Sequence, residues 1–183
     1  VVRAGEQVSC DLNAGEVLLP SALGRLLGAV ERAPEAVGAY GLCDGQSVDS
    51  GRATRRGVKD GQVVRWPDAE PTTFAVVAVA GSGPVTSGQV LIRREALLAA
   101  GRWDPVLERS AEWDLWLRVT RQGPLAYLPE PVVRVGVQST KADDESLMFS
   151  TYVLFKWARD RQLSEDQRAV LAVGIREFGR NLS

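Results

Sequence analysis

Strand-like and helix-like patterns alternate along most of this chain, and that alternation limits what it can fold into. Short apolar runs bounded by turn-forming residues lie at 8–10, 36–42, 87–92 and 132–135. Helical patterns lie between them, at 20–34, 94–100 and 111–123. Strands that alternate with helices are typical of α/β proteins, in which helices cover the faces of a sheet. We therefore predict an α/β fold, with a sheet flanked by helices.

The first helical segment shows the pattern most clearly. Its apolar residues Leu23, Leu26, Leu27 and Val30 fall at i, i+3, i+4 and i+7, which places them on one face of a helix. Ser21 precedes this stripe and is expected to be the N-cap. The apolar run at 74–80 has no such period, so it fits a buried strand or a short helix equally well.

Two further helices are expected at the end of the chain, at 143–161 and 164–180. The second opens with Ser164, followed three residues later by Gln167, which fits a capping box. An apolar stripe marks the first of them and indicates either a packing face or a surface for a ligand, a membrane or a partner; it comprises Leu147, Met148, Tyr152, Phe155 and Ala158. We predict a helical extension over 143–183, packed on an α/β domain over 1–142.

Charge and length exclude several classes of protein. Lys and Arg total 22 against 23 for Asp and Glu, so no overall field draws the chain to nucleic acid. No apolar run approaches the roughly 20 residues of a membrane-spanning helix, and no leader segment opens the chain. We therefore expect no nucleic-acid partner, no transmembrane segment and a cytoplasmic location.

Residue types also limit the chemistry. The chain contains no histidine, so any mechanism must work without imidazole as base or metal ligand. Cys10 and Cys43 lie far apart with no CxxC spacing, which excludes a zinc site. We expect both to be buried reduced thiols, with a disulfide as the alternative.

Four motifs follow one another in an order that resembles a known family. They are GEQVSCDLNAGEVLLPSALGRLL, APEAVGAYG, SGQVLIRREALLAAGRWDPVL and AEWDLWLRVTRQGPLAYLPEPVVRV. Over about residues 4–139 this succession resembles the latter, acceptor-side part of family 2 glycosyltransferases of the GT-A fold. The resemblance implies transfer of a sugar from a nucleotide-diphosphate donor to an acceptor, and a partial GT-A-like sheet.

The resemblance implies a metal site in the first motif. The family has an Asp-x-Asp motif after this strand, where acidic oxygens hold Mg²⁺ or Mn²⁺ together with the donor diphosphate. Asp11 and Asn13 have that spacing here, and Glu16 follows slightly later. An amide oxygen carries no charge, so the site should bind a cation more weakly than two carboxylates would. The alternative is a polar turn that closes on its own backbone.

The stretch SAEWDLWLR corresponds to Glu-Asp-Trp-Asp-Leu-Trp in the family, where the first Asp takes the proton of the acceptor hydroxyl. Glu112 stands at that position, and Ala111 replaces the preceding Glu. A carboxylate suits the role of base, but a longer side chain needs the backbone to compensate. Trp113 is either a core residue or a substrate-binding residue, and Asp114 either binds substrate or forms a salt bridge on the helix.

Two more substrate-binding residues follow from the resemblance. Arg93 lies after the strand at 87–92, where the family places part of the acceptor wall. Gln138 stands where many relatives have a histidine near the metal, and an amide is a poorer ligand for a divalent ion. An Arg-rich segment at 52–59 is either a solvated loop or a contact for a diphosphate or an anionic acceptor.

The family carries about half of its domain, including the strands that grip the nucleotide, ahead of the acidic motif. These strands have no counterpart in this sequence, and central strands lacking their neighbours leave unpaired edges. We expect a protein partner, a second copy or the rest of a longer polypeptide to supply them. Two functions therefore stay open: sugar transfer, or a catalytically inactive binding or assembly module. A third interpretation is a partner-binding surface on the helices of 143–180.

Overall fold

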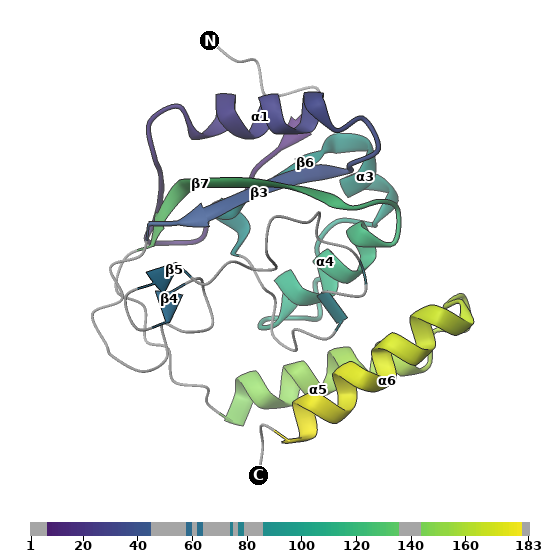
Figure 1. Cartoon of the computed structure of the whole chain (residues 1–183). Coiled ribbons are helices and arrows are strands. Elements are labelled where there is room, and N and C mark those ends of the chain that lie inside the picture. Colours follow the sequence, from purple (N-terminus) through teal and green to yellow (C-terminus); the bar gives the residue numbers. More distant parts are fainter. Residues whose placement is uncertain are drawn as a thin grey trace.

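The computed structural model describes residues 7–44, 58–59, 62–63, 74, 77–78, 86–135 and 144–180. These residues form a five-stranded mixed sheet with helices on both faces (Figure 1). The α/β class expected from the alternating patterns is confirmed.

The sheet has the strand order β1-β6-β3-β7-β2. The bounds are Val8–Ser9 for β1, Val90–Arg93 for β6, Gly38–Cys43 for β3, Leu125–Val135 for β7 and Glu16–Leu18 for β2. Only β3 and β7 run parallel, while β1 and β3 are antiparallel to β6 and β2 is antiparallel to β7. Within the described residues, no strand pairs with the outer edge of β1, so the sheet ends there.

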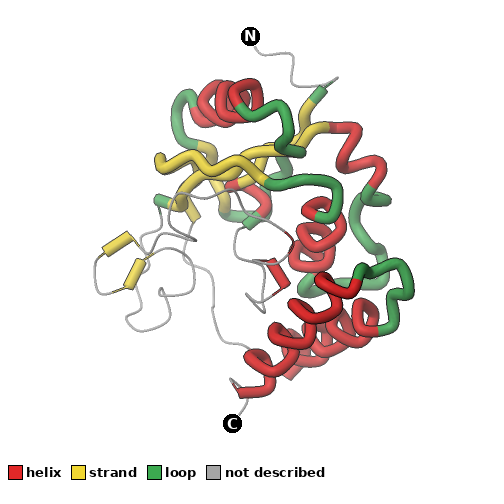
Figure 2. Tube along the Cα trace, turned by 45° about the vertical axis from the view of Figure 1, so that its right-hand side comes forward, coloured by secondary structure: helices red, strands yellow, loops and turns green. Residues whose placement is uncertain are grey.

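Helices cover both faces of the sheet. Helix α1 (Ala22–Arg32) covers one face, and α4 (Ala111–Thr120) packs on the other (Figures 1 and 2). Beyond α4 lies a pair of long helices, α5 (Asp144–Ala158) and α6 (Glu165–Arg180). Shorter elements complete the description: α3 (Arg94–Ala99), the 3-10 helix η2 (Ser87–Gln89) and the two-stranded sheet of β4 (Val58–Lys59) and β5 (Gln62–Val63).

Most predicted elements form with shorter bounds, and the strand predictions need three corrections. The run at 87–92 divides into η2 and then β6. The strand expected at 132–135 is the end of the longer β7, whose pairing with β3 shifts register around Leu42 and thereby accommodates the two prolines. The strand β2 has no counterpart among the predicted strands, because three residues are too few to show a strand period.

The two predicted helix caps differ in outcome. At α6 the Ser164 amide donates to Gln167 Oε1 at 3.1 Å and the Gln167 amide donates to Ser164 Oγ at 3.2 Å, so the capping box is confirmed. Ser21 does occupy the N-cap position of α1, but its side chain makes no capping bond. Its φ of 62° is left-handed, whereas a residue that caps a helix with its side chain typically has an extended backbone.

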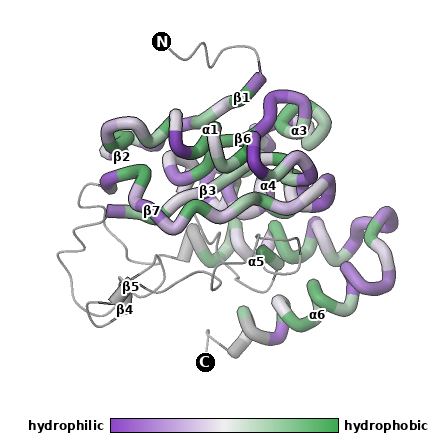
Figure 3. The backbone as a smooth tube through the Cα atoms, turned by 45° about the horizontal axis from the view of Figure 1, so that its top comes forward, coloured by the Kyte–Doolittle hydropathy of each residue, from purple (hydrophilic) through white to green (hydrophobic). Residues whose placement is uncertain are grey.

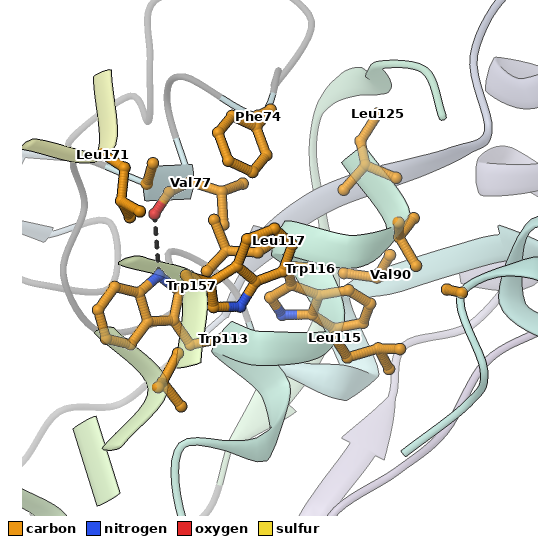
Figure 4. Packing of buried hydrophobic residues seen from close by; sticks show 14 of the residues in the cluster. Phe74, Val77, Val90, Trp113, Leu115, Trp116, Leu117, Leu125, Trp157 and Leu171 are labelled. Atoms are coloured by element: carbon orange, nitrogen blue, oxygen red, sulfur yellow. Dashed lines mark hydrogen bonds between the residues drawn. The ribbon is translucent and has the colours of Figure 1, made fainter. Parts of the chain in front are cut away.

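The buried residues form two clusters, one on each side of the sheet. On the α1 side, Leu26 and Val30 pack on Ala39, Leu91 and Val132. On the α4 side, the cluster is larger and rich in tryptophan (Figure 4), and it includes Trp113, Trp116 and Trp157. Successive residues of β6 alternate between the two clusters, as the pleat of a strand requires.

The run at 74–80 joins the larger cluster. Its described residues Phe74, Val77 and Ala78 are helical and buried, so the helix alternative holds for them. The Trp113 indole donates to the Val77 carbonyl at 3.0 Å (Figure 4). This contact joins α4 to a segment that lies 36 residues earlier.

The stripe predicted on α5 does not form a packing face. Met148, Tyr152 and Phe155 are 58%, 47% and 66% exposed, whereas Leu154 and Trp157 are buried. Helices α5 and α6 carry hydrophobic and hydrophilic residues in succession along their length (Figure 3). Because α5 has apolar residues on more than one face, periodicity could not show which face packs. The exposed stripe is the feature that the partner-binding interpretation requires.

Cys10 and Cys43 form no disulfide with each other in the structure, and both are only partly buried, not fully buried as expected. Within the described part of the chain, no helix is long and apolar enough to cross a membrane.

Candidate functional site

The turn after β1 meets the first turn of α4. There the Asn13 side-chain amide donates to Glu112 Oε1 at 2.7 Å, across 99 residues of sequence. The acidic turn and the predicted base therefore lie beside each other. The structure brings these two predicted site residues together.

Glu112 is held by a second element as well. Its Oε1 accepts hydrogen bonds from the Ser87 amide at 2.8 Å and from Ser87 Oγ at 2.7 Å. Ser87 begins η2, so the 3-10 helix that precedes β6 fixes this side chain. Glu112 is partly exposed, and all three of these hydrogen bonds go to Oε1.

A second carboxylate, Glu16, lies behind this pair. It is only 7% exposed, and its Oε2 accepts from the Asn13 amide N–H at 2.9 Å and from the Gly88 amide at 3.0 Å. A Cβ at position 88 would lie 2.7 Å from that oxygen, so glycine permits the close approach. Glu16 thereby ties the turn to η2.

Asn13 bridges the two carboxylates. Its Nδ2 donates to Glu112 Oε1 at 2.7 Å and to Glu16 Oε1 at 3.3 Å. Both neighbours are acceptors, so the amide must present its hydrogens to them. The amide thus lies between two carboxylates, where a cation would otherwise balance their charge. The described residues include no group of three or more acidic, Cys or His side chains able to hold a metal ion.

The side chain of Asp11, the other predicted metal ligand, points toward Trp103 and not toward Glu112. Its Oδ2 accepts a hydrogen bond from the Trp103 indole at 3.3 Å. Asp11 and Asn13 share a turn, but one side chain is directed to Trp103 and the other to Glu112.

Arg93 lies on the opposite side of the sheet from Glu112. Its guanidinium donates to the Ala36 carbonyl at 2.9 Å and to the Val30 carbonyl at 3.1 Å, which secures the end of α1. Residues 90 and 92 of β6 face the α4 cluster, so residue 93 faces α1. The structure does not bring Arg93 together with Glu112.

Trp113 and Asp114 are both buried next to Glu112 in sequence. Trp113 is 1% exposed and belongs to the core. Asp114 is 0% exposed and accepts from Arg118 Nε at 2.9 Å, Lys156 Nζ at 3.0 Å and Trp157 Nε1 at 3.0 Å. The salt bridge expected on this helix is present, and Asp114 also joins α4 to α5. Gln138 and the Arg-rich residues 52–56 lie outside the described residues.

From the sequence, no role in this site was assigned to three of its residues: Glu16, Ser87 and Trp103. Glu16 follows Asn13 by three residues, a spacing that fits a side chain closing its own turn, and this signal was present. Ser87 and Trp103 lie in separate segments, and no local pattern joins either of them to Glu112 or Asp11.

Two groups near this region have shifted pKa values. Burial, together with the negative charges of Asp11 and Glu16, raises the pKa of the Cys10 thiol to about 11. A hydrogen bond from Lys156 lowers the pKa of Asp104 below its usual 3.8, and the Val106 amide adds to this effect.

Comparison of the chain with protein-family models, with curated proteins and with solved structures finds no match. The functional argument therefore depends on the residues and their geometry.

Proposed function

We propose that this chain forms the acceptor side of a sugar-transferring domain that resembles family 2 glycosyltransferases, with Glu112 as the base. The observation that carries the proposal is the contact of Asn13 with Glu112 at 2.7 Å. It places the turn expected to face the donor beside the carboxylate expected to face the acceptor. Donor and acceptor groups must meet at one place for direct displacement.

In the proposed reaction Glu112 Oε2 accepts the proton of an acceptor hydroxyl. The hydroxyl oxygen forms a bond to the anomeric carbon of the donor sugar, and the bond from that carbon to the nucleoside diphosphate breaks. The diphosphate leaves with the bonding electron pair. Ser87 and Asn13 hold Oε1 through three hydrogen bonds, which keeps the carboxylate in one orientation for proton transfer.

The predicted Mg²⁺ or Mn²⁺ fits the described side chains poorly. Asn13 presents amide hydrogens, not its oxygen, to the two glutamates, and Asp11 is directed to Trp103. A divalent ion needs several oxygen ligands that converge on one point. No step of the proposed reaction is therefore assigned to a metal.

The second candidate is a catalytically inactive binding or assembly module, and two observations favour it. The Asn13 amide takes the place of a cation between Glu16 and Glu112. The outer edge of β1 has no partner strand among the described residues, and an unpaired edge accepts a strand from another chain.

Calorimetric titration with uridine, guanosine and thymidine diphosphate sugars in the presence of Mn²⁺ separates the two candidates. Saturable heat with one of them supports a donor site. Uniformly flat titrations on a folded sample contradict sugar transfer by this chain and favour the module.

Where a donor binds, Glu112→Gln should lower turnover much more than donor affinity, because the amide cannot accept the proton. Glu108→Gln is the matched control, since Glu108 is an exposed carboxylate in the loop before α4. An equal loss of turnover and affinity in Glu112→Gln would contradict its role as base.

A further inference from the structure

One tryptophan in the described part of the chain differs from the rest. Trp113, Trp116 and Trp157 are at most 3% exposed and belong to the core, so they have no free ring face for a ligand. Trp103 is partly exposed, in the loop between α3 and α4. It is therefore the described indole that a ligand can reach.

Trp103 is held by contacts on two sides. Its ring packs edge-on against Trp116, with centroids 6.3 Å apart and planes at 66°. Its Nε1 donates to Asp11 Oδ2 at 3.3 Å. The indole therefore has a fixed orientation while part of its surface stays in solvent.

The backbone before Trp103 is held in a strained form. Gly101 and Arg102 have φ values of 80° and 61°, and the second is costly for a residue with a Cβ. The Arg118 guanidinium donates to the carbonyls of Ala100 and Arg102 and so stabilises this turn. Arg118 is itself paired with the fully buried Asp114 at 2.7 Å. A network anchored in the core thus positions the loop that presents Trp103.

Trp103 lies in the neighbourhood of the proposed site. Its partner Asp11 is on the same turn as Asn13, which contacts Glu112. Its packing neighbour Trp116 lies one helical turn after Glu112 on α4. Cys10 precedes Asp11 in the sequence, and Arg102 precedes Trp103. Both line a surface cavity of about 380 Å³ together with Leu97 and Leu98.

An indole beside a carboxylate suits a sugar ring. The ring has a face of C–H groups that packs on an aromatic surface, and hydroxyls at its edge that donate to a carboxylate. A nucleotide fits less well, because its phosphates would be repelled by Asp11.

We propose that Trp103 is the platform on which a sugar ring of the acceptor stacks, with Asp11 accepting a hydrogen bond from one of its hydroxyls. The acceptor of this domain is then a saccharide or glycoside. Calling the bound sugar the acceptor rests on the proposed function, but the binding of a sugar at Trp103 does not.

The test follows the indole N–H resonances of ¹⁵N-labelled protein during titration with methyl glycosides of glucose, galactose, mannose and N-acetylglucosamine. Trp103→Phe assigns the resonance of Trp103 by removing it. At least one glycoside should shift this resonance saturably. The variants lack the Trp103 indole, so their affinity is followed through the backbone amide resonances in the same titration. Trp103→Ala should weaken that binding about fivefold or more, and Trp103→Phe less, because it keeps a ring.

Three controls make the result specific. Asp11→Asn should also weaken binding, since it removes the charged acceptor. Tyr152→Ala, at an aromatic residue 47% exposed on α5, should leave affinity unchanged. The buried indole resonances report whether each variant is folded.

A parallel titration with uridine tests for binding of a nucleoside instead of a sugar. The proposal is overturned if no glycoside shifts the Trp103 resonance, if only uridine shifts it, or if Trp103→Ala keeps full affinity. The titration contains no donor, metal or turnover. A flat donor titration therefore does not contradict sugar binding at Trp103. Likewise, a lack of glycoside binding at Trp103 does not contradict the donor site.

Discussion

The Asn13 side chain lies between Glu16 and Glu112 and donates from one nitrogen to both, at 3.3 Å and 2.7 Å. A neutral amide thereby satisfies two carboxylates that would otherwise repel each other. This arrangement decides how the site responds to substitution and to cations.

Asn13→Asp should destabilise the protein in the absence of divalent ions. A third carboxylate would replace the donor that now separates the other two, which should cost about 1–3 kcal/mol in the free energy of unfolding. The same change adds a charged oxygen ligand, so Mn²⁺ should raise the melting temperature of this variant more than that of the wild type. Thermal unfolding in EDTA and in MnCl₂ measures both effects.

Asn13→Ala is the control for that experiment. It removes the amide donor without adding charge, so it should lose stability but gain no response to Mn²⁺. Equal stability of Asn13→Asp and wild type in EDTA would contradict the bridging role of the amide.

Asp114→Asn should destabilise the protein strongly. Asp114 is 0% exposed and accepts from Arg118, Lys156 and Trp157. The amide would leave the partly buried Arg118 without this carboxylate and Lys156 with Asp104 alone. Loss of one partner of a buried ion pair predicts a cost of about 3 kcal/mol. Urea unfolding measures it.

The exposed pair of Arg134 and Asp44 offers the matched comparison, with side chains 59% and 46% exposed at 2.9 Å. Asp44→Asn should cost less than about 1 kcal/mol, because water screens this pair. Similar losses in Asp44→Asn and Asp114→Asn would show that Asp114 is not the buried anchor between α4 and α5.

Leu154 and Phe155 are neighbours in sequence on different faces of α5, being 6% and 66% exposed. Leu154→Ala should cost about 2–5 kcal/mol, since it leaves a cavity in the core. Phe155→Ala should change stability by no more than about 0.5 kcal/mol, as expected for a surface position. Denaturant unfolding of the two variants checks which face of α5 packs, and a larger loss at Phe155 would reverse the assignment.

Cys10 should react slowly with iodoacetamide at neutral pH. Its reaction rate should continue to increase with pH beyond the point at which the rate of an ordinary cysteine levels off. The thiolate is the reactive form, and burial raises the pKa of this thiol from 9.0 to about 11. In a Cys43→Ser background the rate should therefore keep rising toward pH 11, whereas in urea it should level off near the ordinary value. A plateau near pH 9 in the folded protein would contradict burial of this thiol.

The same shift affects stability at alkaline pH. The folded state keeps the Cys10 proton that the unfolded chain releases above pH 9.0, so this contribution is complete below 9.0 and is lost as pH rises to about 11. Cys10→Ser should reduce the fall in melting temperature over this range.

The sequence by itself determined the α/β class and the positions of most helices. These depend on patterns within a few residues, such as the stripe from Leu23 to Val30 and the capping box of Ser164 and Gln167, which form wherever the segment lies. The adjacency of the acidic turn and Glu112 was expected from the resemblance and not from any local pattern.

Only the tertiary structure decided what each polar group contacts. The strand pleat turned Arg93 toward α1, the fold of the 101–103 loop brought Trp103 to Asp11, and packing selected Leu154 over Phe155 for the core. These outcomes depend on partners far away in the sequence, so their free energies arise only when the segments meet.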